Sequence, residues 1–159
     1  MNTKACVFCD IAQGTAPAHI IWEDHNYVAF LSLFPNTEGA TIVIPRAHYE
    51  SYLFSPEVPT EVVIGIMFAS RKAARILDNA FEDVGRTAVI VEGFGVNHLH
   101  TKLFPLHGTP KTWASFSSTY RKYFDKYEGY VSSHSSDKAD DETLRRIRNK
   151  ILSGKKTRS

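Results

Sequence analysis

Runs of apolar and β-branched residues predict the strands of this chain. Residues 20–31 contain two such runs around a polar turn, which is typical of a β-hairpin. Residues 40–45 are almost wholly apolar, which favours a strand buried on both faces. A further strand is expected over residues 87–92. The Gly93-Phe94-Gly95 turn after it predicts that the next strand is its antiparallel neighbour.

Two other stretches repeat their apolar positions at helical spacing. Residues 55–81 predict a long amphipathic helix with alternative starts at Ser55 and Pro59, and with a polar face of Arg71, Lys72, Arg75 and Asp78. The stretch 140–151 begins with acids and ends with bases, which matches the helix dipole. It carries a narrow apolar stripe of Leu144, Ile147 and Ile151.

Histidine and lysine alternate with apolar residues in the stretch 96–105. On a β-strand, successive side chains point to opposite faces, so His98, His100 and Lys102 would share one face. The other face would carry Leu99, Thr101 and Leu103. Such a row is either a catalytic surface or simply the solvated face of a strand. Pro105 has no N–H to donate and is expected to end this strand.

Together these elements predict an α+β fold with a mainly antiparallel sheet, one long helix and a C-terminal helix. We place the folded domain at residues 1–131. Residues 132–159 are expected to comprise a polar linker, the C-terminal helix and a tail that is disordered from residue 153. The aromatic-rich stretch 111–131 shows no clean period, so no element is predicted there.

Composition restricts the class of protein. The chain has 159 residues, of which 43% are hydrophobic and 12% aromatic, enough to bury a sizeable core. No apolar run reaches the roughly 18 residues of a membrane span. The N-terminal residues also lack the apolar region of a signal peptide, so we expect a cytoplasmic protein without a membrane partner.

Charge is unevenly distributed. Residues 1–110 hold 7 Lys/Arg and 11 Asp/Glu, whereas residues 111–159 hold 12 and 6, for a net charge of +2 over the chain. A basic C-terminal third could attract phosphates or nucleic acid. We favour a solvated helix and tail, and nucleic acid is the least favoured partner.

Both cysteines lie in one Cys-x-x-Cys pair, Cys6 and Cys9. In a reducing compartment such a pair favours metal binding or redox chemistry over a structural disulfide. Its position before any strand pattern favours metal. Zinc prefers four ligands, and among the seven histidines His48 and His98 lie where a strand ends or begins. The alternative is a pair of buried thiols without metal.

His100 is the candidate nucleophile. A histidine whose Nδ1 is held by a backbone carbonyl keeps Nε2 free to act as base or nucleophile. Lys102 on the same face would supply positive charge for a phosphoryl oxygen. The alternative is an ordinary hydrogen-bonded histidine. The glycines at 93 and 95 form no phosphate-binding fingerprint, although their amides could donate to a phosphate beside His100.

An ordered series of motifs resembles the histidine-triad (HIT) superfamily over residues 6–106. It consists of Cys6-Val-Phe-Cys9-Asp10-Ile11, Glu23-Asp24, Ala29-Phe30, Pro35, Gly39, Ile42-Val43-Ile44-Pro45-Arg46-x-His48 and His98-Leu-His100. The stretch 138–151 is similar to the tail helix of bacterial members. The resemblance implies an α+β fold, a homodimer and nucleotide phosphate chemistry with His100 as nucleophile. It also implies a structural zinc held by Cys6, Cys9, His48 and His98.

The chain departs from the family pattern at several positions. Lys102 stands where the third motif histidine is expected. Ser32 replaces an acid or amide that grips the ribose, Ala40 replaces a histidine, and Phe94 replaces a glutamine that serves the phosphate. The residues that we expect to contact the substrate are Ser32, Asn36, Gly95, Asn97 and His107.

Three functions remain open from the sequence. The leading hypothesis is a nucleotide hydrolase that acts on dinucleoside polyphosphates, nucleoside phosphoramidates or similar esters, with His100 and Lys102 as catalytic residues. In the related galactose-1-phosphate uridylyltransferase branch the third position is glutamine and the enzyme transfers, so a nucleotidyltransferase is the second hypothesis. The third is a zinc-stabilised nucleotide-binding module without catalysis.

Overall fold

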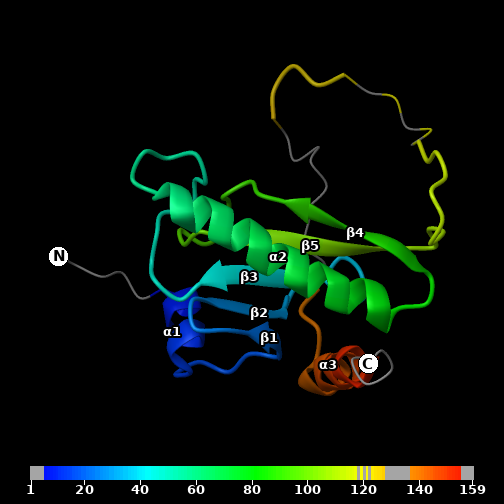
Figure 1. The fold of residues 1–159 in the computed structure, drawn as a ribbon, viewed down its shortest axis with the longest axis horizontal. Coiled ribbons are helices and arrows are strands. Elements are labelled where there is room, and N and C mark those ends of the chain that lie inside the picture. Colours follow the sequence, from blue (N-terminus) through cyan, green and yellow to red (C-terminus); the bar gives the residue numbers. More distant parts are fainter. Residues whose placement is uncertain (1–5, 118, 120, 122, 128–136, 155–159) are drawn as a thin grey trace.

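The computed structural model describes residues 6–117, 119, 121, 123–127 and 137–154. It is an α+β fold, as predicted, with one five-stranded antiparallel sheet in the order β1-β2-β3-β5-β4. The long helix α2 crosses one face of the sheet, and the short helix α1 lies on the other side of it (Figure 1). The expected linker at 132–136 and the tail at 155–159 lie outside the described residues.

The predicted hairpin and the buried strand are both present. β1 (Ile20–Glu23) pairs with β2 (Tyr27–Leu31), and the turn is closed by the Asp24 carboxylate, which accepts from the backbone N–H groups of Asn26 and Tyr27. β3 (Thr41–Pro45) is buried along its whole length. Because successive residues face opposite ways, Ala29 and Val43 enter the core under α2. The residues before and after each of them pack under α1: Val28, Phe30, Ile42 and Ile44.

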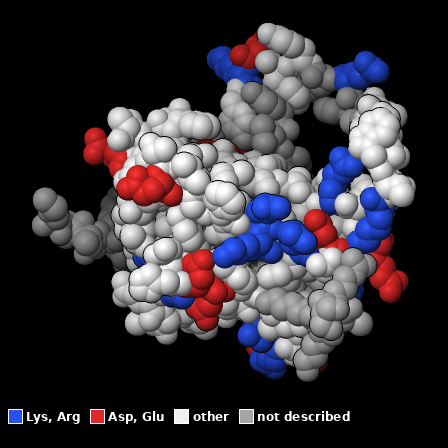
Figure 2. All heavy atoms as spheres, in the orientation of Figure 1, with Lys and Arg blue, Asp and Glu red and all other residues white. Residues whose placement is uncertain are grey.

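The long helix α2 covers residues Thr60–Ala80. It uses the second of the two expected starts: Ser55 instead closes a turn, in which its hydroxyl accepts from the N–H of Glu57. Leu77, Ala73 and other apolar residues of its inner face are buried against the sheet. Basic side chains lie over the exposed face of α2 (Figure 2), in agreement with the expected exposure of Arg71, Lys72 and Arg75.

The C-terminal helix α3 (Asp141–Ser153) belongs to the same core. Its apolar stripe of Leu144, Ile147 and Ile151 is buried with residues of the sheet and of α2. Asp140 caps the helix by accepting from the N–H of Thr143 at 2.8 Å. Arg148 donates from Nε to the carbonyl of Ile20 at 2.6 Å, which covers the β1 edge of the sheet. Contrary to the expectation of disorder from residue 153, Ser153 is the last helical residue.

Three details of the other edge differ from the prediction. β4 (Val84–Ile90) begins three residues before Thr87, and β5 (Thr101–His107) begins after the two histidines instead of including them. Residues 91–100 therefore form a longer connection than the expected tight turn. Pro105 does not end the strand: it lies beyond the residues of β5 that pair with β3, and its β4 partner Thr87 lies next to a shift in register.

Beyond β5 the described part of the stretch 111–127 forms no helix or strand and exposes Trp113, Phe116 and Tyr123. None of the helices in the described residues has the length and apolar character that a membrane span requires. The outer face of α2 also exposes Ile64 and Phe68. The homodimer that the family resemblance implies stays a prediction.

Candidate functional site

The candidate site lies on the sheet face opposite α2, beneath the short helix α1 (Val7–Gln13). Gly14, with φ of 78°, ends this helix in the left-handed conformation that favours glycine. Phe8 points from α1 onto Phe30 of β2, and its ring also meets His98 and His100 edge-on with centroids 5.9 and 5.5 Å apart. Helix α1 thus covers both motif histidines.

The alternation expected for residues 98–103 holds although the strand starts only at Thr101. Leu99 packs against α2, and the Thr101 hydroxyl lies 2.7 Å from that of Ser70 on this helix. His98 and His100 face the opposite way, toward α1. They are not a solvated row: His98 is 0% exposed and His100 is 3% exposed. The solvated-face alternative for these two histidines is therefore wrong, because α1 covers them.

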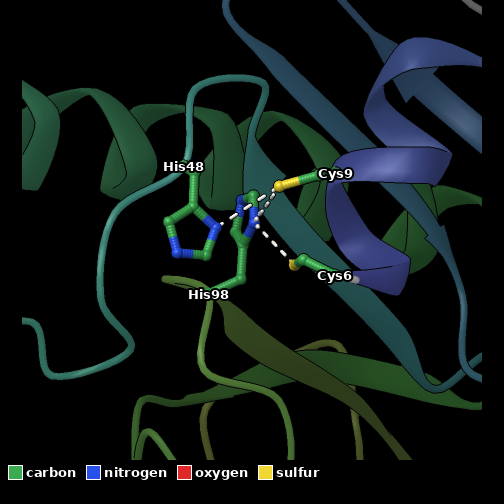
Figure 3. A group of neighbouring side chains, drawn as sticks. All are labelled: Cys6, Cys9, His48 and His98. Atoms are coloured by element: carbon green, nitrogen blue, oxygen red, sulfur yellow. Dashed lines mark hydrogen bonds between the residues drawn. The ribbon is translucent and has the colours of Figure 1, made fainter. Parts of the chain in front are cut away.

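Four of the predicted residues converge on one point (Figure 3). The side-chain ligand atoms of Cys6, Cys9, His48 and His98 all lie within 4.8 Å of one another. The Nδ1 atom of His98 lies 3.5 Å from the Sγ atoms of both cysteines, and His48 Nδ1 lies 3.3 Å from Cys9 Sγ. Three separate segments supply them: α1 with the residue before it, the loop after β3, and the loop before β5.

This donor set fits zinc. Bonds of about 2.3 Å to sulfur and 2.0 Å to nitrogen in a tetrahedron require ligand atoms roughly 3.5 Å apart. The second ring nitrogen of His98, Nε2, lies 2.9 Å from the carbonyl of Pro45, which fixes the ring with Nδ1 toward the cysteines. Without a cation, burial and then the neighbouring Cys6 raise the pKa of Cys9 to about 11.

His100 is held in a defined orientation. Its Nδ1 donates to the carbonyl of His98 at 2.7 Å, which leaves Nε2 as the nitrogen with a lone pair. Burial lowers the pKa of His100 below 6.5, and the positive charge of Lys102 adds to this shift. The backbone carbonyls of His98 and Phe94 and the Glu92 carboxylate oppose it. Both Lys102 and Glu92 therefore act electrostatically on this imidazole.

Lys102 and Glu92 form an ion pair beside His100. The ammonium contacts one carboxylate oxygen, and the side chains of Lys102 and Glu92 are 20% and 11% exposed. The sequence predictions did not include Glu92. It was placed at the end of the strand 87–92, and its proximity to Lys102 follows from the β4–β5 register, in which Ile90 pairs with Lys102.

A family model described as the HIT domain matches residues 13–109. The chain belongs to the HIT family. It is 32% identical over 107 residues to an uncharacterized HIT-like protein of Methanocaldococcus jannaschii, which covers 63% of this chain and 78% of that protein.

Solved HIT structures are also similar. The crystal structure of a zinc-bound histidine triad family protein from Mycobacterium smegmatis has a TM-score of 0.62 and 25% identity, and covers 97% of this chain and 98% of that one. A HIT family hydrolase from Legionella pneumophila has a TM-score of 0.52 and 29% identity, over 69% of this chain and 97% of that one.

Four of the residues expected to contact a substrate of this HIT protein lie in two connections, the one between β2 and β3 and the one between β4 and β5. The Ser32 hydroxyl accepts from the N–H of Phe34, and the Asn97 side chain accepts from the N–H of Ser51. Gly95 has φ of 96°, and a Cβ added there would have no heavy atom within 4 Å. Asn36 Oδ1 is buried without a hydrogen-bond partner among the described residues, so it retains an acceptor.

His107 lies at the opposite end of β5 from Lys102, so the structure does not bring it to His100. Its two ring nitrogens contact the Asp83 carboxylate at 3.1 Å and the Glu38 carbonyl at 3.0 Å. These contacts join the loop after β2, the loop after α2 and the end of β5. The environment of His107 in this HIT domain is that of a structural histidine.

The His107–Asp83 pair predicts a pH window for stability. Burial lowers the pKa of His107, but the Glu38 carbonyl and Asp83 outweigh it and raise the pKa above 6.5. The hydrogen bond from His107 is the main cause that lowers the pKa of Asp83 below 3.8. The stabilisation should therefore be complete between pH 3.8 and 6.5. It should disappear as His107 loses its proton at higher pH, or as Asp83 gains one at lower pH.

Urea unfolding of the wild type and of Asp83→Asn, at pH values within the range 3.8–6.5 and on both sides of it, would measure this pH dependence. The difference in the free energy of unfolding should be largest inside it and shrink on both sides. A difference that stays constant with pH would contradict the assignment.

Proposed function

We propose that this HIT protein is a nucleotide phosphate hydrolase that works through a nucleotidyl-histidine on His100. Membership of the HIT family and similarity to a HIT family hydrolase support a nucleotide-related activity. The substrate classes that we propose are dinucleoside polyphosphates, nucleoside phosphoramidates and similar esters.

The observation that carries the proposal is the fixed orientation of His100. Because Nδ1 donates to the His98 carbonyl, the lone pair needed for attack on phosphorus is on Nε2. A short backbone hydrogen bond of this kind also restricts rotation of the ring. The nucleophile is thus prepared before the substrate binds.

The proposed reaction has two displacements. His100 Nε2 forms a bond to the α-phosphorus while the bond from phosphorus to the leaving-group oxygen or nitrogen breaks. Water then attacks the same phosphorus and breaks the N–P bond, which restores the imidazole and releases a nucleoside monophosphate. Lys102, in place of the third motif histidine, stabilises the charge that develops on the phosphoryl oxygens.

Zinc has a structural role in this proposal. Cys6, Cys9, His48 and His98 would fill all four positions of a tetrahedral site, so no position remains for substrate or water. When bound, the ion supplies a rigid link between α1 and the loop that carries His98. His100, two residues along the chain, is then held in place by that link.

Substrate contacts complete the proposal. We propose that the buried acceptor of Asn36 and the backbone of Gly95 contribute to nucleotide binding, together with Ser32 and Asn97. Ser32 and Asn97 would have to exchange their present hydrogen bonds for contacts with the ligand. His107, held at the far end of β5, is the least suited of the predicted contacts.

The test combines turnover with detection of the intermediate. The protein is incubated with diadenosine tetraphosphate and with adenosine phosphoramidate, and samples quenched in denaturant are analysed by intact-protein mass spectrometry. We expect release of AMP and a transient protein adduct with the mass of one adenylyl group. Binding of nucleotide without turnover or adduct would instead favour the non-catalytic module. Appearance of the adenylyl group on an added phosphate acceptor would favour a transferase.

A further inference from the structure

The carboxylate of Glu92 has no part in the proposed reaction, yet it contacts the lysine that should meet the phosphoryl group. Glu92 Oε1 accepts from the ammonium of Lys102, and both side chains are largely removed from solvent. A buried charge is unfavourable without a partner, so Glu92 stabilises Lys102 in this position by neutralising its charge. In this structure the positive charge of Lys102, near His100, is therefore already paired with the Glu92 carboxylate.

The second oxygen of the same carboxylate is also engaged. The Tyr127 hydroxyl donates to Glu92 Oε2 at 3.4 Å. The ring of Tyr127 stacks on Phe94, with centroids 5.8 Å apart and planes at 23°. Tyr127 belongs to the aromatic-rich stretch after β5, so this stretch returns to the site and contacts Glu92. The two oxygens of Glu92 therefore have different partners.

We propose that Glu92 is an internal counter-ion that a phosphoryl group must displace from Lys102, so that the pair selects ligands by their negative charge. This inference rests on the proposed function, because it needs a phosphate at His100 and Lys102. A phosphoryl oxygen would take the place of Glu92 Oε1 on the ammonium. Tyr127 would continue to donate to Glu92 Oε2.

The exchange has a chemical logic. Lys102 keeps an anionic partner before and after binding, so a phosphate ligand replaces one ion pair by another. A neutral ligand offers no such replacement and leaves the Lys102–Glu92 pair intact. Glu92 therefore weakens the binding of every phosphate ligand while it protects the site against uncharged ones. Only a negatively charged ligand can therefore displace Glu92 from Lys102.

The test measures AMP affinity by isothermal titration calorimetry at fixed pH and salt. Glu92→Gln removes the competing charge and keeps the shape of the side chain, so we expect AMP to bind roughly five- to tenfold more tightly than to the wild type. Adenosine, which lacks the phosphate, should bind both proteins equally. Glu61→Gln, an exposed change at the start of α2, is the matched control and should leave AMP affinity unchanged.

A double-mutant cycle separates competition for Lys102 from simple repulsion of the phosphate. In a Lys102→Met background, Glu92→Gln should give a clearly smaller gain in AMP affinity than it gives in the wild type. An unchanged or weaker AMP affinity of Glu92→Gln, or an equal gain in both backgrounds, would overturn the proposal.

Tyr127→Phe provides a second variant that does not depend on the folding of Glu92→Gln. It removes the hydrogen bond from the Tyr127 hydroxyl to Glu92 Oε2. This bond stabilises the carboxylate after it has left Lys102, so AMP affinity should fall roughly two- to threefold without it. Unchanged or higher AMP affinity would contradict the proposal.

Failure of the proposed function would be seen separately, as absence of diadenosine tetraphosphate hydrolysis in the wild type. The AMP titrations, in contrast, decide the role of Glu92.

Discussion

Replacement of His100 by alanine is expected to reduce hydrolysis of diadenosine tetraphosphate by at least about a thousandfold and to remove the adenylyl adduct. The reason is that the residue forms the covalent bond, so no neighbouring group can substitute for it. Steady-state kinetics and mass spectrometry of quenched samples would measure both effects. Because the substitution leaves a space beside Phe8, added imidazole is expected to restore part of the turnover.

The control is His25→Ala, which removes an exposed histidine from the β1–β2 turn. It should keep both the wild-type rate and the adduct. Turnover that survives in His100→Ala at the wild-type rate would exclude His100 as the nucleophile. An adduct that persists in this variant would place the nucleophile elsewhere in the chain.

Removal of zinc is expected to destabilise the fold and to reduce activity. At a metal concentration a thousandfold above the dissociation constant, a bound ion contributes about 4 kcal/mol to the free energy of unfolding. For a domain of this size that corresponds to a fall in Tm of about 8–16 °C. Calorimetry before and after dialysis against a chelator would measure the shift, and elemental analysis should find about one zinc per chain before dialysis.

Cys9→Ser tests the same site without a chelator. The variant should bind less than a tenth of the wild-type zinc, by rough expectation, and its Tm should match that of the chelator-treated wild type. His25→Ala again serves as control, because its imidazole lies outside the cluster. A full complement of zinc in Cys9→Ser, or an unchanged Tm after chelation, would refute the assigned ligands.

Local periodicity was sufficient to predict most of the elements. The first hairpin, the buried strand β3 and the helices α2 and α3 each depend on a pattern within one short stretch, and the structure confirms them. The end of β5 could not be predicted in the same way. Pro105 lies next to a shift in the β4 register and beyond the residues of β5 that pair with β3, and both registers depend on the neighbouring strands.

The candidate site was predictable where coordination chemistry limits the choice. Two cysteines need two further ligands for zinc, and His48 and His98 lie at positions that a tertiary fold can bring together. Burial of His100 was not predictable, because it depends on α1 and the Phe8 ring from the other end of the chain. Glu92 and Tyr127 were missed for a similar reason: their contact joins segments that are far apart in the sequence.

The connection before β5 carries His98 and His100 on the same side of the chain, two residues apart. One inserted or deleted residue between them would turn one imidazole away from α1 and toward α2, because side chains alternate in extended backbone. The metal cluster and the proposed nucleophile would then no longer coexist. In this HIT domain the two-residue spacing therefore keeps both imidazoles on the side of α1, and homologous proteins that keep both features should show no length variation there.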